Sequence, residues 1–520
     1  MSIAESPPAR RTNRGAEAPR IDGGAEAPRI DGGAEAPRID GGAAAPRIDG
    51  GAAAQPNTLR WWALIVLLAG GFMPPLDFFI VNVALSSIQQ SLHASPAELQ
   101  LVISGYACGY GVFLITGGRL GDLYGRRRCF LIGMAAFSLA SLGCGIATSP
   151  VHLVLARIIQ GSAAALLLPQ VLGSIRTLFP NERELARAMS AYGIMMGMAA
   201  AIGQFSGGAL IQWNPYGLGW RIIFLLTVPV CAATLVLASR LVPETAGTRN
   251  VRLDLGGAAL MSLALAAVVV PLSVGREQGW PLWVLICLAA VPLLALGFIR
   301  YEARLSRRGG MPLVEMALLR IPSFRRGVLV AALFFFTTSF YLLFGLYQQE
   351  GRGMPPLDVG LAIVPYGVGL FLGPLLTAPL VRLRPWLLSI GMGIQVTFYT
   401  AIGALVAVGV IGPLLSLAVF LAGFGQGIAF PRLFATVLGD VPGPQGGVAA
   451  GITNSAMQVG AAVSVAAIGS LFFVVLGSGG GERAYAHAFA IAQWTATAGL
   501  FLAMLLTLPS RRTLAAPSVK

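Results

Sequence analysis

Asp77 is the residue in this chain whose type and place most directly suggest chemistry. It lies within the apolar stretch Met73–Leu85, two residues after Pro75. A charged side chain at mid-membrane costs roughly 2.5–3.5 kcal/mol on insertion scales, so it normally faces a cavity or a partner group. A carboxyl in that position suits proton coupling or cationic substrate binding, and the alternative is a structural hydrogen bond near the membrane surface. The neighbouring prolines predict a kinked helix at this point.

Arg157 is the one arginine that we place inside an apolar span, Leu153–Gly161. Gln160 follows three residues later and shares its helix face. A permanent positive charge there needs a partner, and Asp77 is the obvious candidate. If the two are coupled, protonation of Asp77 would release Arg157 to other contacts. The alternative is that Arg157 clamps helices together through several backbone carbonyls.

Further polar residues within the spans are candidates for a central cavity, because amides facing lipid are unfavourable. Each of them is as well suited to packing as to binding. They are Asn82, Tyr106, Tyr110, Gln160, Gln204, Tyr341, Tyr347, Gln395, Tyr399, Gln426, Asn454 and Gln458. The aromatic residues 334–336 and Phe340 are expected to face lipid or the core.

The elements that must hold these residues are membrane-spanning helices. The chain has 520 residues, of which 56% are hydrophobic and 11% are charged, whereas soluble proteins carry roughly a quarter charged residues. The apolar runs are continuous rather than alternating, which favours helices over a barrel. We predict fourteen spans, at 62–85, 99–118, 129–147, 152–175, 189–211, 222–239, 256–275, 280–299, 327–348, 357–380, 385–409, 412–431, 447–476 and 485–508.

The basic residues follow membrane topology, so the net charge of +14 does not indicate a nucleic-acid partner. Besides Arg157, the exceptions to one-sided placement are Arg221, Arg276, Arg352 and Arg483. This bias predicts that both termini lie in the cytoplasm of a bacterium, with the chain as a multi-pass protein of its cytoplasmic (inner) membrane. The chain shows no phosphate-binding loop, nucleophile motif or Cys/His metal set, so we expect no cofactor, no metal and no enzymatic activity.

The domain organisation that we predict has five parts. Residues 1–60 hold four copies of a nine-residue Gly/Ala/Pro-rich repeat and are expected to be a disordered cytoplasmic tail. An N-terminal six-helix bundle follows at 61–240, and 241–326 holds two extra transmembrane helices and a cytoplasmic loop. In that loop, 312–320 is a candidate helix on the membrane surface. A C-terminal six-helix bundle at 327–510 precedes a cytoplasmic tail at 511–520.

A charged turn between two spans, 118–128, concentrates four arginines and Asp122 at one membrane face. Its glycines, Gly118, Gly121 and Gly125, permit tight backbone contact. The turn resembles the loop signature G-x-L-[AG]-D-[RK]-x-G-R-[RK] of the major facilitator superfamily, with Leu123 in place of a basic residue. Leu153–Gly161 looks like that superfamily's fourth-span signature with its buried arginine.

Several further stretches resemble the 14-spanning drug:H⁺ antiporter branch of that superfamily. Leu76–Leu85 is similar to its first-span signature L-D-x-T-I-V-N-V-A-L, with Phe79 in place of Thr, and residues 220–229 and 446–454 look like its sixth- and thirteenth-span entries. Residues 203–208 resemble its G-P-x-x-G-G motif, with Gln204 where the branch usually has proline. The resemblance covers about 62–510.

The resemblance implies an all-α membrane fold of two six-helix bundles plus two central extra helices. Substrate would bind at mid-membrane between the bundles, which rock to open either side in turn. It further implies that Asp122 and Arg126, with Gly118, Gly121 and Gly125, form a conformational latch on the cytoplasmic side. Asp77 would carry the proton, and Arg157 would sense its charge.

We therefore expect a transporter, working as a monomer in the lipid bilayer, that exports small amphipathic compounds or drugs in exchange for protons. Uptake or facilitated diffusion of a metabolite is the first alternative. A membrane-embedded enzyme is the remote one, because it would need a reactive pair that the sequence does not contain.

Overall fold

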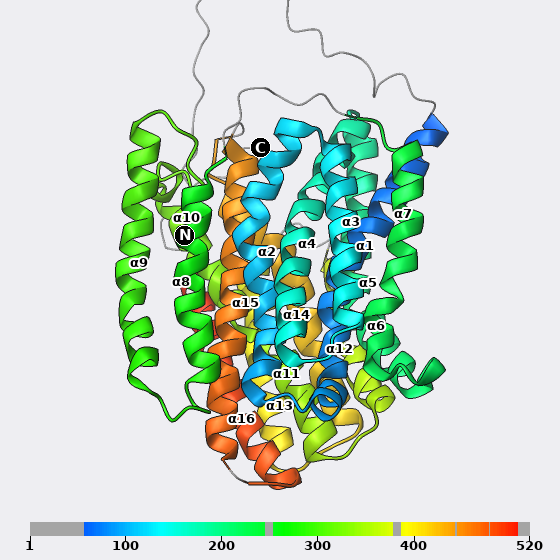
Figure 1. The fold of residues 1–520 in the computed structure, drawn as a ribbon, viewed down its shortest axis with the longest axis vertical. Helices are drawn as coiled ribbons and strands as arrows, with labels where there is room; N and C mark the ends of the chain where they lie inside the picture. Colours follow the sequence, from blue (N-terminus) through cyan, green and yellow to red (C-terminus); the bar gives the residue numbers. More distant parts are fainter. Residues whose placement is uncertain (1–56, 245–252, 378–385, 443–444, 478, 508–520) are drawn as a thin grey trace, which may run out of the picture. The chain divides into compact units, whose positions relative to one another are not determined.

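The computed structural model describes residues 57–244, 253–377, 386–442, 445–477 and 479–507, and every regular element among them is helical (Figure 1). The α-helices are α1 Asn57–Leu92, α2 Pro96–Tyr124, α3 Arg126–Gly145, α4 Pro150–Leu178, α5 Glu182–Trp213, α6 Ile222–Leu225, α7 Thr227–Leu241, α8 Leu255–Val274, α9 Leu282–Arg307, α10 Pro322–Phe334, α11 Ser339–Leu346, α12 Pro356–Thr377, α13 Leu387–Ala407, α14 Pro413–Leu438, α15 Gly446–Leu476 and α16 Glu482–Thr507. Fourteen described helical segments are long and apolar enough to cross a membrane, as the sequence predicted.

The start of α2 shows how local sequence sets a helix boundary. Ser95 accepts a hydrogen bond from the Glu98 amide at 3.2 Å, and the Glu98 carboxylate accepts one from the Ser95 amide at 2.8 Å. This reciprocal pair satisfies two backbone donors that the first helical turn leaves free. Pro96 follows in the first turn, where its missing N–H costs nothing.

Several helices run further than the predicted spans, because a helix can extend past the apolar core into water. The predicted tail ends at 60, but α1 already begins at Asn57; the rest of that tail, 1–56, and the tail at 511–520 lie outside the described residues. The predicted turn at 118–128 is largely helical, since α2 continues to Tyr124 and α3 begins at Arg126. Only Gly125 interrupts them, with a φ of 97° that favours glycine.

Two spans are divided in a way that the sequence did not indicate. The predicted span 222–239 consists of α6 and α7, and the span 327–348 consists of α10, a 3₁₀ turn at Phe335–Thr338, α11 and a π-helical turn at Tyr347–Gly351. Departures of this kind alter which side chains face inward at a given depth.

The prediction of a surface helix at 312–320 was wrong for most of that segment. The structure has only a 3₁₀ turn, Leu318–Arg320. The backbone just before it is engaged elsewhere: Arg119 donates to the Met311 carbonyl at 2.8 Å and also to that of Pro312. Carboxylates of Asp254 and Glu302 accept from the Leu313 and Val314 amides. Side chains from other helices thus replace the hydrogen bonds that a helix would make.

The helices form two groups of neighbours, which we call the N-terminal helices (α1–α7) and the C-terminal helices (α10–α16). In the first group α2 and α3 pack against α4, and α1 packs against α5 and α7. In the second, α12 and α13 pack against α14, and α10 and α13 pack against α16. The groups meet where α5 contacts α12 and where α2 contacts α15.

The two intervening helices, α8 and α9, stand together at one side of the structure (Figure 1). Helix α8 packs against both α2 and α15, so it touches each group. Helix α9 contacts α8 and is largely exposed, with Leu293 70% and Leu282 71% accessible. Such an apolar outer face suits contact with lipid tails.

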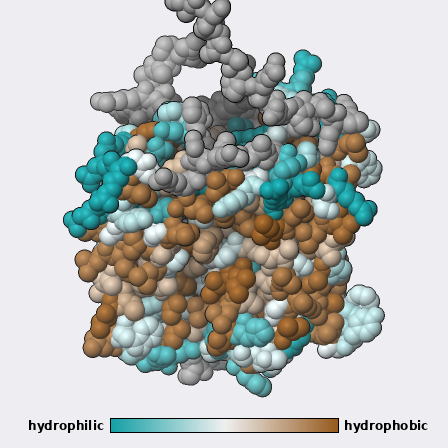
Figure 2. Space-filling model, turned by 45° about the horizontal axis from the view of Figure 1, so that its top comes forward, coloured by the Kyte–Doolittle hydropathy of each residue, from teal (hydrophilic) through white to brown (hydrophobic). Residues whose placement is uncertain are grey.

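The surface carries the pattern expected of a membrane protein. Figure 2 shows a band of apolar residues across the face in view, with polar residues above and below it. Large apolar side chains such as Leu139 and Ile132 are more than half exposed. In water such a band would be unfavourable, whereas in a bilayer it is the contact surface.

Candidate functional site

A hydrogen-bonded polar site in the interior is built around Asp77 on α1. The helix continues through Pro74 and Pro75, and the Pro74 carbonyl accepts a hydrogen bond from the Tyr106 hydroxyl at 3.2 Å. That bond ties α1 to α2 one turn before Asp77. The Asp77 side chain is completely buried.

Asp77 pairs directly with Arg157 of α4, which is also completely buried. The Asp77 Oδ2 atom accepts a hydrogen bond from Arg157 Nη1, while Arg157 Nε donates to the Val102 carbonyl of α2 at 3.2 Å. The expected pairing of these two residues is therefore present in the structure, and of the several carbonyl contacts in the alternative, Arg157 makes the one to Val102. A buried charge of either sign requires such compensation.

Gln160 completes the pair from one turn further along α4. Its amide group donates to Asp77 Oδ1 at 2.9 Å, and its carbonyl accepts from Arg157 Nη1 at 2.7 Å. Gln160 also donates to Ser141 Oγ at 3.1 Å, and Ser141 lies 2.6 Å from the Thr227 hydroxyl. A continuous hydrogen-bonded network therefore joins α1, α4, α3 and α7, and we call Asp77, Arg157, Gln160, Ser141 and Thr227 the charged network.

Aromatic rings cover the guanidinium of the charged network. The Arg157 guanidinium carbon lies 4.3 Å from the centre of the Tyr106 ring and 5.8 Å from that of Phe224. Tyr106 in turn stacks on Tyr110 with ring centres 6.5 Å apart. A ring face attracts a desolvated cation, so these contacts stabilise Arg157 without providing a second negative charge.

Close helix packing makes this arrangement possible. Gly161, directly after Gln160, lies against the Tyr106 carbonyl so tightly that a methyl group there would overlap it. Gly117 is in the same relation to the Ala165 carbonyl. These glycines let α2 and α4 approach closely, as small residues do between membrane helices.

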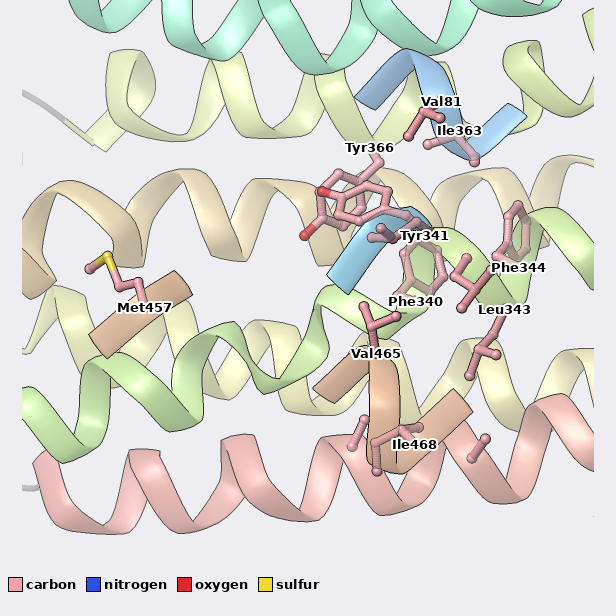
Figure 3. Close-up of a cluster of buried hydrophobic side chains, with 14 of the residues drawn as sticks. Val81, Phe340, Tyr341, Leu343, Phe344, Ile363, Tyr366, Met457, Val465 and Ile468 are labelled. Carbon is pink, nitrogen blue, oxygen red and sulfur yellow. The ribbon is translucent and has the colours of Figure 1, made fainter. Parts of the chain in front are cut away.

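A second buried polar cluster lies among the C-terminal helices. Tyr366 and Tyr399 bring their hydroxyls within 2.8 Å of each other, and the Tyr366 hydroxyl also donates to the Gln426 side-chain carbonyl. Figure 3 shows the rings of Phe340, Tyr341 and Tyr366 side by side, with Phe340 and Tyr366 centred 5.7 Å apart. We call Phe340, Tyr341, Tyr366, Tyr399 and Gln426 the aromatic cluster.

The aromatic cluster reaches the N-terminal helices through one ring. Phe79, two residues after Asp77, packs edge-on against Tyr341 with ring centres 5.2 Å apart. The charged network and the aromatic cluster are therefore linked through neighbouring positions of α1. Phe340 is fully buried, in agreement with one of the two environments expected for it.

The remaining cavity candidates occupy varied positions. Asn82 donates to the Phe78 and Phe79 carbonyls of its own helix at 2.8 and 3.3 Å, which is a packing role. Gln204 and Gln395 are fully buried on α5 and α13. Asn454 and Gln458 are half-buried on α15, where Gln458 faces Gly111 of α2. Gly203, directly before Gln204, packs against α1 at Leu76 and Phe79.

The residues of the expected latch lie where α2 meets α3 and α4. Arg126 pairs with Asp122 at 3.2 Å, and both side chains are partly exposed. Gly121 leaves room for the Gln170 amide of α4, and Arg126 lies over Gly173. Near the C-terminal end of α1, Ser86 hydrogen-bonds to Glu350, and Gln349 donates to the Val83 carbonyl at 3.0 Å. The latter contacts join the two helix groups.

Sequence reasoning missed Ser141, Thr227 and Tyr366. A hydroxyl in an apolar helix usually bonds to its own backbone, so residue type alone does not distinguish a network member. Thr227 does bond to the Phe224 carbonyl at 2.6 Å, yet it also contacts Ser141. A tyrosine in the middle of 357–380 was the available signal for Tyr366.

Comparison with known proteins agrees with this architecture. The probable actinorhodin transporter of Streptomyces coelicolor is 36% identical over 432 residues, covering 81% of this chain and 74% of the relative. The puromycin resistance protein of Streptomyces alboniger is 35% identical over 427 residues, covering 80% and 82%. The tetracenomycin C resistance and export protein of Streptomyces glaucescens is 32% identical over 416 residues, covering 79% and 76%.

Solved structures share the fold. The xylose transporter of E. coli in a partially occluded inward-open conformation superimposes with a TM-score of 0.59 at 13% identity, covering 87% of this chain and 100% of the other. A peptide transporter in complex with sulfate gives 0.59 at 15% identity, covering 85% and 94%. The model of the Major Facilitator Superfamily matches residues 67–465. The chain is a multi-pass transporter of the cytoplasmic membrane and belongs to the Major Facilitator Superfamily.

Proposed function

We propose that this transporter exports small amphipathic organic compounds in exchange for protons. The buried pair of Asp77 and Arg157 is the observation that carries the proposal. A carboxylate with one fixed cationic partner and one amide donor has a defined bonding arrangement when ionised. Protonation would remove the negative charge and leave Arg157 to rely on Gln160, Val102 and the Tyr106 ring. Such a change can bias two conformations against each other.

The direction of transport is proposed from relatives. Three of them are named for actinorhodin, puromycin and tetracenomycin C. Export of such compounds would need energy, and protons returning through the same protein would supply it. Uptake or facilitated diffusion of a metabolite is the alternative hypothesis, and the direction of substrate flux distinguishes it from export.

Residues 61–240 and 327–510 would act as two rocking bundles, with 241–326 inserted between them and substrate bound between the bundles at mid-membrane. Both termini would be cytoplasmic, and the protein would work as a monomer. Asp122 and Arg126 would latch the cytoplasmic side, and the contacts of Ser86 with Glu350 would close the other side.

Asp77→Asn tests the coupling. The purified protein is first screened for compounds that raise its melting temperature, with puromycin as the starting probe. The best compound is then added to the medium around proteoliposomes that carry an imposed pH gradient. We expect Asp77→Asn to lose gradient-driven accumulation by at least about tenfold while retaining exchange of labelled for unlabelled compound. The amide cannot carry the proton, although it can keep a hydrogen bond to Gln160.

Asp358→Asn is the matched control, because Asp358 is exposed at the start of α12. It should transport as the wild type does. Undiminished gradient-driven transport by Asp77→Asn would refute coupling at Asp77. Equilibration of the compound without accumulation by the wild type, whatever the pH gradient, would favour facilitated diffusion instead.

A further inference from the structure

Two buried carboxylates lie outside the charged network, at one end of the intervening helices. Asp254 caps the start of α8, where its Oδ1 atom accepts hydrogen bonds from the Gly257 amide at 2.7 Å and from the Tyr301 hydroxyl at 3.0 Å. Glu302 lies on α9 and is completely buried, while Asp254 is 4% exposed. Burying two acidic side chains close to each other requires an explanation.

These carboxylates hold the segment Met311–Leu318, which we call the strap. Asp254 Oδ2 accepts from the Leu313 amide at 3.0 Å, and Glu302 Oε2 accepts from the Val314 amide at 2.9 Å. Leu313 and Leu318 are buried. The strap is therefore seated by hydrogen bonds from two helices and by its own apolar side chains.

The strap also connects both helix groups. Arg119 of α2 donates to the carbonyls of Met311 and Pro312, and Gln445, which precedes α15, donates to Glu315 at 3.3 Å. Residues that move relative to one another when the helix groups rearrange would thus meet at the strap. Its seating would add to the stability of any conformation in which these contacts form.

One carboxylate oxygen in this site has no donor. Glu302 Oε1 has no hydrogen-bond partner among the described residues, and it faces the Asp254 carboxyl. Both Glu302 Oε1 and Asp254 Oδ2 lie against the space above Gly257. Ionised carboxylates can only accept hydrogen bonds, so two of them cannot bond to each other, whereas one shared proton supplies the missing donor.

The surrounding charges do not supply that donor. Arg119 directs its guanidinium to the strap carbonyls, Tyr301 already donates to Asp254, and Glu315 of the strap adds a further negative charge. We infer that Asp254 and Glu302 form a second proton-binding site, in which one shared proton keeps the strap seated on α2, α8 and α9. Loss of the proton leaves two like charges in a site that excludes water, and their repulsion releases the amides of Leu313 and Val314.

Hydrogen exchange of the strap in the full-length protein tests this inference. The protection of the Leu313 and Val314 amides is measured by mass spectrometry between pH 6 and 9 and corrected for the intrinsic pH dependence of exchange. We expect wild-type protection to fall by at least about tenfold, since two states that differ by one bound proton change their ratio tenfold for each pH unit.

Glu302→Gln should make this protection independent of pH. Its amide would donate permanently to Asp254, and its carbonyl would still accept from Val314. Asp254→Asn tests the same exchange of roles should Glu302→Gln not fold. Glu315→Gln is the matched control, because Glu315 bonds to Gln445 and not to the carboxyl pair; it should retain the wild-type pH dependence.

Two outcomes would overturn the inference. One is wild-type protection that stays constant over this pH range, or pH dependence that persists in both amide variants. The other is protection restored at pH 9 by sodium chloride but not by choline chloride, which would assign the site to a metal cation. Asp77→Asn should leave the pH dependence of the strap intact, so the result is separable from the coupling proposal.

Discussion

The charged network and the aromatic cluster hold polar groups in the interior of this transporter in different ways. The charged network of the N-terminal helices holds a full ion pair, Asp77 and Arg157, and surrounds it with donors and rings. The aromatic cluster of the C-terminal helices holds hydroxyls and amides, and no acidic or basic side chain is buried in the described part of that group. Both centres lie next to α1, one at Asp77 and the other at Phe79.

This difference suggests that the charged network and the aromatic cluster have different functions. Charge that changes on proton binding needs partners at fixed positions, because an uncompensated charge in the membrane interior is costly. Neutral rings and hydroxyls tolerate varied organic compounds, because ring faces offer large contact areas with few directional demands. In the proposed mechanism, the charged network would therefore serve coupling, and the aromatic cluster would serve recognition of the exported compound.

Arg157→Met should have the largest effect, and it tests whether the charged network depends on its ion pair. Removing the guanidinium leaves Asp77 buried without its cationic partner, which typically costs about 3–5 kcal/mol. We expect a marked fall in the melting temperature of the purified protein and loss of transport. Asp77→Asn combined with Arg157→Met should recover part of that stability. If Arg157→Met alone were as stable as the wild type, Arg157 would not be what compensates the charge of Asp77.

Tyr366→Phe should have an intermediate effect, and it tests whether the aromatic cluster serves recognition of the exported compound. It removes the hydroxyl shared by Tyr399 and Gln426 but keeps the ring. Two neutral hydrogen bonds contribute about 1–3 kcal/mol together. We expect the KM for the exported compound to rise several-fold, with the number of protons exchanged per molecule unchanged. Tyr216→Phe, at a site 98% exposed, is the control; an altered proton ratio in Tyr366→Phe would contradict this separation of functions.

Ser141→Ala should have the smallest effect, because it removes only the outer part of the charged network. The bonds of Ser141 to Gln160 and Thr227 are neutral, and such bonds contribute about 0.5–1.5 kcal/mol each. We expect a small drop in melting temperature and transport close to wild type, measured against Ser138→Ala one turn earlier on α3. Loss of coupling in Ser141→Ala would extend the proton site beyond Asp77 and Gln160.

Much of the architecture could be predicted because few backbone structures can satisfy their hydrogen bonds within lipid. A continuous apolar run must satisfy its own backbone, so helices follow, and all fourteen spans were found. Their ends were less accurate, as at 118–128, because a helix can continue into water with no change in hydropathy. Residues 312–320 were a candidate for a helix on the membrane surface, but Arg119, Asp254 and Glu302 engage the backbone of the strap.

The class of molecule, the family and the pairing of Asp77 with Arg157 could be predicted from the sequence alone. These conclusions follow from composition, span length and motif spacing, which are local properties. The structure was needed to show that Gln160, Ser141 and Thr227 join Asp77 and Arg157, that Tyr366 meets Tyr399, and that Asp254 faces Glu302. Each of these contacts joins residues on different helices, and the rotation and depth of packed helices depend on side chains along the whole of both.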